Sequence, residues 1–267
     1  LVSISFAPIL LSISPTPAFD TTKPMSFRRL FEVSPLGFVG IFLMGGVYSA
    51  LFGMASVYGS VAGLSVGQIS LFVASIYLGG LMTQFPIGWL SDRMDRRVLI
   101  LGVAAAGAVA AALAMTLGGT LSVLLVAAFF VGGTSNPLYA LLIAYTNDFL
   151  DHDDMAAASG GLLFVNGVGA IAGPLITGWI MGQVGPGGFF LFIALLMGAL
   201  GLYSGYRMTQ RPAPTVEETG TYAPVLPTAT AVAVEAAQEV FIEGLEEAEE
   251  EDPDAEGPEG AAKQPGT

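Results

Sequence analysis

Six long apolar stretches dominate this sequence of 267 residues. They cover residues 36–58, 67–91, 98–118, 120–147, 156–182 and 188–208. Each has about the 20 mostly apolar residues that an α-helix needs to cross the hydrocarbon core of a bilayer. Because lipid offers no hydrogen-bond partners to the backbone, a single stretch of this length must be helical there. The sequence therefore predicts an all-α membrane protein with a bundle of six transmembrane helices.

Positive charges fall at alternate breaks between these stretches. Lys23, Arg28 and Arg29 precede the first stretch, Arg93, Arg96 and Arg97 follow the second, and Arg207 and Arg211 close the sixth. The opposite breaks, near residues 59–66, 118–120 and 183–187, contain no Lys or Arg. Short cytoplasmic loops carry the Lys/Arg excess of membrane proteins. We therefore expect both ends of the unit in the cytoplasm, at the plasma (inner) membrane.

The two ends of the chain differ from its centre. Residues 1–13 are apolar but too short to span a bilayer, and they lack the flanks of a signal peptide. We interpret them as the end of a truncated helix in a fragment, followed by a cytoplasmic linker at 14–35 and the six-helix domain at 36–208. Residues 209–267 carry 14 Asp/Glu against two basic residues. This composition predicts a disordered acidic cytoplasmic tail, with a regulatory contact as the alternative.

Composition excludes several functions. Residues 1–208 hold seven Lys/Arg against eight Asp/Glu, so no basic surface for nucleic acid is expected. The chain has no cysteine, and its single histidine, His152, lies in an acidic loop where solvation is the ordinary state. Inside the apolar stretches there is no carboxylate pair, nucleophile with its base, or metal set. We therefore expect neither an enzyme nor a bound metal or cofactor.

The turn after the second stretch concentrates charge in the sequence "GWLSDRMDRRVLI", residues 88–100. Its residues Gly88, Asp92, Arg93, Arg96 and Arg97 resemble the G-x-L-x-D-R-x-G-R-R motif of the major facilitator superfamily. That motif lies between the second and third helices of a six-helix half, which is its place here. One position departs, because Asp95 stands where the motif has glycine; Asp tolerates the left-handed backbone better than most residues.

The resemblance implies a twelve-helix fold of which this chain is the second half. It also implies a secondary active transporter that moves a small solute by alternating access between two halves, so the missing N-terminal half, the lipid bilayer and the solute are the expected partners. The alternative is a receptor or assembly partner that does not transport.

The charged turn is expected to act as a cytoplasmic gate. We expect Asp92 to accept hydrogen bonds from the free N–H groups at the start of the fifth helix. The arginines are expected to meet the acidic loop that contains Asp148, Asp151, Asp153 and Asp154. The alternative is a set of solvated ion pairs worth about 0–1 kcal/mol each, with the arginines serving only to orient the protein.

The sequence "GVGAIAGPLITG" in the fifth stretch contains Gly169, Gly173 and Pro174. Small residues four apart allow helices to approach closely, so these residues are assigned to helix packing. The sequence also resembles the G-x-x-x-G-P motif that the same superfamily carries in many antiporters, which leaves antiport as the second interpretation.

Polar and aromatic side chains within four stretches form the candidate substrate cavity. They are Tyr48, Tyr77, Gln84, Asn136, Tyr139 and Asn166. Polar groups within a membrane are costly unless they face protein or water, so these residues are expected to face inward. The alternative for each is a hydrogen bond to a neighbouring helix.

Overall fold

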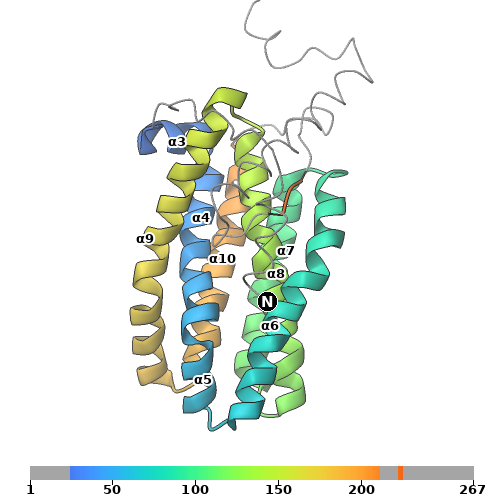
Figure 1. The fold of residues 1–267 in the computed structure, drawn as a ribbon, viewed down its shortest axis with the longest axis vertical. Coiled ribbons are helices and arrows are strands. Elements are labelled where there is room, and N and C mark those ends of the chain that lie inside the picture. Colours follow the sequence, from blue (N-terminus) through green and yellow to red (C-terminus); the bar gives the residue numbers. More distant parts are fainter. Residues whose placement is uncertain (1–24, 211–221, 225–267) are drawn as a thin grey trace, which may run out of the picture.

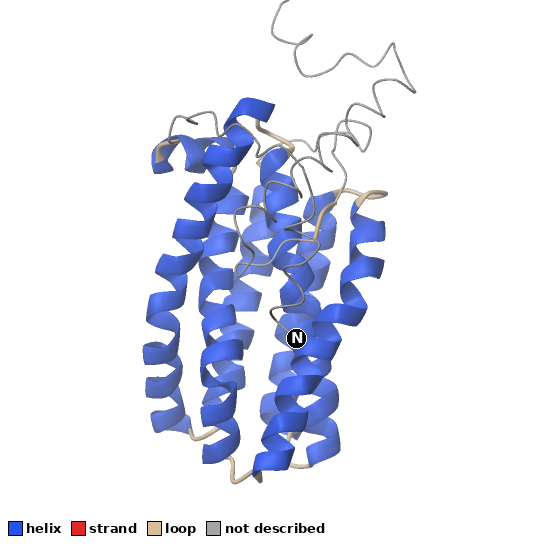
Figure 2. Cartoon of the chain, viewed as in Figure 1, coloured by secondary structure: helices blue, strands red, loops and turns tan. Residues whose placement is uncertain are grey.

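The protein forms a bundle of antiparallel helices, as a computed structural model of the chain shows for residues 25–210 and 222–224 (Figure 1). The elements are α3 (Phe27–Val33), α4 (Pro35–Tyr48), the π-helical turn η1 (Ser49–Met54), α5 (Ala55–Val61), α6 (Val66–Ser91), α7 (Arg96–Leu117), α8 (Leu121–Asn147), α9 (His152–Val184) and α10 (Gly188–Met208). The described part of the chain contains helices, turns and loops but no strand (Figure 2).

Six helical segments are long and apolar enough to span a membrane, which confirms the predicted fold class. The first is composite, because α4, η1 and α5 follow one another without a break over Pro35–Val61. The other five are α6, α7, α8, α9 from Asp154 onward, and α10. The observed ends lie within a few residues of the predicted ones, since charges and glycines mark the breaks.

The charged connections gather at one end of the bundle, which we call the α3 end. Helix α3, the α6–α7 and α8–α9 connections and the end of α10 all lie there, and the other three connections lie at the opposite end (Figure 1). Helix α3 falls within the predicted linker. The predicted helix end at 1–13 and all of the tail after Gln210 except Tyr222–Pro224 lie outside the described residues.

Serine side chains define several helix starts. The Oγ of Ser34 accepts a hydrogen bond from the Gly37 N–H at the start of α4, where Pro35 occupies the first helical position. Ser65 and Gln68 form a capping box at the start of α6. These caps satisfy N–H groups that the helix itself leaves unpaired, so α4 and α6 begin where the sequence places the cap.

Glycines bring α4 and α9 into close contact. A Cβ added to Gly169 would overlap the carbonyl oxygen of Phe42, and one added to Gly45 would overlap that of Asn166. Gly173 is similarly close to the Oγ of Ser49, and Pro174 follows it within α9. Backbones can approach this closely only where no side chain intervenes, which favours packing as the role of these glycines.

Substitution of Gly169 by alanine is expected to loosen the α4–α9 contact. Overpacking at a contact of this kind costs about 1–3 kcal/mol, so Gly169→Ala should lower the apparent melting temperature of the purified protein. Gly167→Ala is the matched control, since an added Cβ meets nothing within 4 Å at that position of the same helix. Equal melting temperatures for the two variants would contradict the packing role.

Membrane orientation can be tested without removing native cysteines, because the chain has none. Thr120 and Gln210 are exposed at opposite ends of the bundle. With the α3 end in the cytoplasm, Thr120→Cys in intact cells should react with an impermeant maleimide and Gln210→Cys should react only after permeabilisation. Labelling of Gln210→Cys in intact cells would refute this orientation.

Candidate functional site: the charged turn and the aromatic cluster

The charged turn, residues 88–97, connects α6 to α7 through a cap at each side. The N–H of Asp92 donates to the Gly88 carbonyl at 3.2 Å and ends α6. The carboxylate of Asp95 accepts from the Arg97 N–H at 2.8 Å and begins α7. Asp95 has φ −54° and ψ 114°, so the left-handed conformation allowed for in the sequence analysis is not used. An acid suits this position because its side chain caps the helix.

Arg97 also controls the charge of Asp95. Burial alone would raise the pKa of Asp95, but hydrogen bonds from the side chain and backbone of Arg97, with its positive charge, outweigh that effect and lower the pKa. The Nη2 of Arg97 lies 2.9 Å from the Asp95 carboxylate. The carbonyl of Arg97 accepts a bond from the Ser204 hydroxyl at 3.3 Å, which ties the turn to α10.

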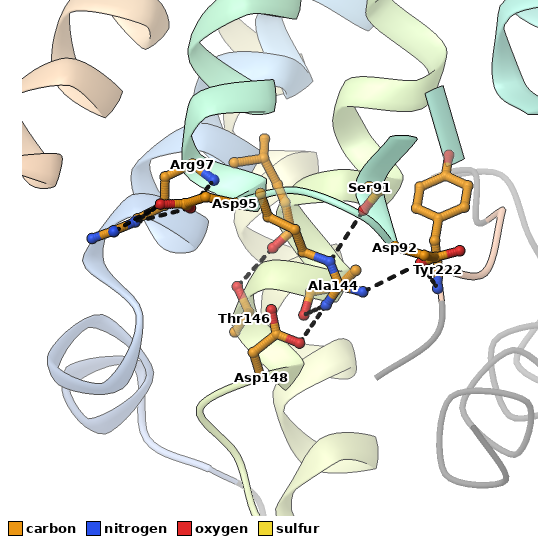
Figure 3. Close-up of polar contacts among 10 residues, drawn as sticks. Ser91, Asp92, Asp95, Arg97, Ala144, Thr146, Asp148 and Tyr222 are labelled. Carbon is orange, nitrogen blue, oxygen red and sulfur yellow. Dashed lines mark hydrogen bonds and ion pairs between the residues drawn. The ribbon is translucent and has the colours of Figure 1, made fainter. Parts of the chain in front are cut away.

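Arg96 is the central charge of the turn. It is only 3% exposed, and its guanidinium donates to the carboxylate of Asp148, the C-cap of α8. It also donates from Nε to the Ser91 hydroxyl at 3.1 Å, and its Nη2 lies 3.7 Å from a carboxylate oxygen of Asp92. The side chain therefore joins the end of α6, the start of α7 and the end of α8. Figure 3 labels its partners Ser91, Asp92 and Asp148.

Asp154 of the acidic loop and Arg93 of the charged turn have other partners than the sequence analysis expected. Asp154 pairs with Arg29 of the preceding helix α3 at 2.6 Å rather than with the charged turn. Arg93 is exposed, with its guanidinium 4.3 Å from the centre of the Trp89 ring and donating to the Trp89 carbonyl at 3.0 Å.

The rest of the acidic loop makes no described contact with the charged turn except through Asp148. Asp151 is exposed, and the side chains of His152 and Asp153 lie outside the described part of the structure. Asp148 is thus the described acidic-loop residue that the turn reaches.

Asp92 has partners that the sequence did not predict. We expected it to meet the first turn of the fifth spanning helix, but the described interactions include none between Asp92 and α9. Its carboxylate instead accepts a hydrogen bond from the Tyr222 N–H at 2.8 Å, in addition to the contact with Arg96 (Figure 3).

Tyr222 is the functional candidate that sequence reasoning missed. Its ring lies on Gly88, where an added Cβ would come within 2.5 Å of Cδ1, and its hydroxyl accepts from Nε2 of Gln84 at 3.4 Å. Burial raises the pKa of Tyr222, so the phenol stays neutral at physiological pH. A signal was present, because Tyr222 is the only aromatic residue between Tyr206 and Phe241.

Two of the six predicted cavity residues, Tyr48 and Tyr139, lie together between α4 and α8, and the side chain of a third, Asn136 of α8, lies against Gly80 of α6. Tyr48 and Tyr139 have ring centroids 5.8 Å apart in an edge-to-face arrangement. The Tyr48 hydroxyl donates to the backbone carbonyls of Ser135 and Asn136 at 3.3 and 3.4 Å. All three predicted side chains, on Tyr48, Asn136 and Tyr139, are buried.

Phe52 extends this group toward α6. It stacks on Tyr48 with centroids 5.4 Å apart and contacts Tyr77 at 5.2 Å. Phe52 lies in the π-helical turn η1, and such turns occur frequently at functional sites. We call Tyr48, Phe52, Tyr77 and Tyr139 the aromatic cluster.

The two remaining predicted cavity residues have local roles. The Asn166 side chain is buried and donates to the Ile41 carbonyl at 3.2 Å, which is a bond between α9 and α4. Gln84 is half-buried and bonds to Tyr222. The sequence analysis assigned Gln84 to the cavity but could not show that it meets Tyr222.

Metal-binding chemistry has no candidate in residues 25–210 and 222–224. No group of three His, Cys, Asp or Glu side chains that could hold a metal ion occurs there. Asp92, Asp95, Asp148 and Asp154 are instead paired with arginines.

Comparison with known proteins identifies the family of this fold and motif. The model of the Major Facilitator Superfamily matches residues 15–243. The chain belongs to the major facilitator superfamily. It is therefore an integral, multi-pass membrane protein of a family of transporters rather than enzymes, as predicted.

Two relatives in the superfamily are similar to this chain over about half of their own length. It is 29% identical over 214 residues to the "Uncharacterized MFS-type transporter YfkF" of Bacillus subtilis (strain 168), covering 75% of this chain and 52% of the relative. It is 27% identical over 175 residues to the "Uncharacterized MFS-type transporter YcaD" of Escherichia coli (strain K12 / DH10B), covering 66% of this chain and 44% of the relative. The chain spans about half the length of these superfamily relatives.

Loss of Arg96 is expected to destabilise the fold more than loss of Arg93. Arg96→Met leaves Asp148 buried without its main partner, and breaking a buried ion pair costs about 3–5 kcal/mol. Arg93→Met removes an exposed charge, which costs about 0–1 kcal/mol. Apparent melting temperatures in detergent measure the difference. The double variant Arg96→Met/Asp148→Leu should recover part of the loss, and equal melting of the two single variants would contradict a structural role for the buried pair.

Proposed function

We propose that this chain is the second half of a secondary active transporter that moves a small solute by alternating access, and that the charged turn is its cytoplasmic gate. The observation that supports the gate most strongly is the buried Arg96, which contacts Asp148 and Asp92 at the ends of two other helices. Membership of a transporter family supports the class of function.

A buried charge network suits a gate because it favours two discrete arrangements. Arg96 cannot leave Asp148 gradually at low cost, since that carboxylate is 1% exposed and would be left poorly solvated without this cation. The helix ends therefore stay together or separate far enough for water to solvate the charges. Packed elements that exchange between two such arrangements are the usual basis of a conformational switch.

The aromatic cluster is the proposed solute-binding surface. Tyr77 is 55% exposed and Phe52 is 41% exposed, so both are accessible from outside the described bundle, while Tyr48 and Tyr139 are buried behind them. The described members of this cluster carry no charge. They favour a solute held by ring stacking and by hydrogen bonds to phenol groups.

A second six-helix unit is the proposed partner across this surface. Support comes from the chain length, which is about half that of the matched relatives. Further support comes from α6, the least buried of the six spans, which exposes Leu81 and Phe85 beyond Tyr77. Paired six-helix halves that rock about a central site are a common arrangement in secondary transporters.

The gate can be tested in proteoliposomes that contain the complete protein. Solutes from a metabolite extract would be supplied under an imposed proton or sodium gradient, and their accumulation would be measured by mass spectrometry. Asp92→Asn removes a charge that Arg96 contacts, so we expect at least one solute to accumulate with the parent protein and about fivefold less with the variant, the effect of losing about 1 kcal/mol.

Glu32→Gln is the matched control, because it makes the same chemical change in an exposed pair with Arg28 at the same end of the bundle. It should transport like the parent. Parental transport by Asp92→Asn at equal protein level would refute the gate. Solute binding without accumulation by the parent protein would favour a receptor instead.

A further inference from the structure

A segment far along the sequence occupies the α6 surface beside the charged turn. Tyr222 lies 130 residues after Asp92 and 138 residues after Gln84, yet it is hydrogen-bonded to both. It is only 9% exposed. The contact therefore joins the C-terminal tail to the last turns of α6, which no feature of the six-helix fold requires.

The surface that receives Tyr222 has three parts of different chemistry. Gly88 leaves a flat notch against which the ring lies, since an added Cβ would come within 2.5 Å of Cδ1 and 2.7 Å of Cε1. The amide of Gln84 donates to the phenol oxygen, and the carboxylate of Asp92 accepts from the backbone N–H. The ring, the hydroxyl and the backbone N–H of Tyr222 thus contact Gly88, Gln84 and Asp92, respectively.

We propose that Gly88, Gln84 and Asp92 form a docking site for the protein's own C-terminal tail, with Tyr222 as the side chain that the site takes. The space beside Gly88 admits a flat ring, and the Gln84 amide selects a ring that carries a hydroxyl. The Asp92 carboxylate holds the backbone N–H of Tyr222. Docking thereby holds Tyr222 beside the charged turn.

Docking of the tail is coupled to the charged turn through one oxygen atom. The Oδ1 of Asp92 accepts from Tyr222 and is also the atom that lies 3.7 Å from Nη2 of Arg96. When the tail leaves, this carboxylate loses a hydrogen-bond donor and its interaction with Arg96 changes. The docking site itself does not depend on the proposed transport function, because it concerns one contact within the chain.

The test is photocrosslinking in the complete protein. p-Azidophenylalanine replaces Tyr222; it keeps the ring and the backbone N–H but carries an azide in place of the hydroxyl. Mass spectrometry identifies the peptide to which it attaches after illumination. We expect attachment within residues 84–92, in monomeric protein. The same probe at Tyr206, an exposed tyrosine of α10, is the control and should not label this peptide.

Two second-site variants test the assigned geometry. Gly88→Ala fills the notch and should reduce the crosslink about tenfold, because the ring must move away from the new methyl group. Gly102→Ala should leave it unchanged, since an added Cβ there meets nothing within 4 Å. Asp92→Ala removes the acceptor of the backbone bond and should also weaken the crosslink.

The outcomes are separable. Attachment of the probe elsewhere, or an unchanged crosslink in both Gly88→Ala and Asp92→Ala, would overturn the docking site. A crosslink found only between two copies of the chain would also overturn it, and would make this surface an interface between molecules. None of these outcomes depends on whether a solute is transported.

Discussion

Hydrogen bonding of the backbone within lipid is the constraint on which this structure depends. Every peptide group in a spanning segment must find its partner in the same segment, so the chain forms helices wherever it is apolar for long enough. Once the helices exist, lipid gives little further apolar driving force for their association. The contacts between them therefore rest on close packing of backbone, as at Gly45 and Gly169 between α4 and α9.

The charged side chains of the described bundle lie at its ends, and Arg96 is the most buried cation among them. The guanidinium is buried at the start of α7, where it reaches Asp148 at the end of α8 and approaches Asp92 at the end of α6. Three helix ends are thus held by one cation, while Arg97 is neutralised by the adjacent Asp95. The two neighbouring arginines consequently differ in role, although the sequence presents them as a pair.

Asp92 links this network to the tail. The same carboxylate that approaches Arg96 accepts the Tyr222 N–H, and the ring of Tyr222 covers Gly88. Glycine at this position therefore has a local physical reason, because any side chain would displace the ring. We thus propose two roles for the motif. It is a gate, and it is also a binding surface for another part of the chain.

The sequence by itself determined the number of spanning helices, their approximate limits and the family. These follow from local properties, since apolar length fixes a membrane span and charges or glycines fix its ends. The motif residues of the charged turn were also recognisable, because their spacing is local. Asp95 could be identified as the departure from the motif, but its use as a helix cap required the backbone geometry.

Only the tertiary structure decided which side chains meet. Tyr48 and Tyr139 lie together in it, whereas Asn166 forms a hydrogen bond between α9 and α4 and Gln84 bonds to Tyr222. The structure added Phe52, which the sequence analysis had treated as ordinary apolar material, and it brought Tyr222 to Asp92 across 130 residues. Periodicity along one helix shows which residues share a face, but the identity of the neighbour across that face depends on how separate helices pack, and no local pattern in the sequence records it.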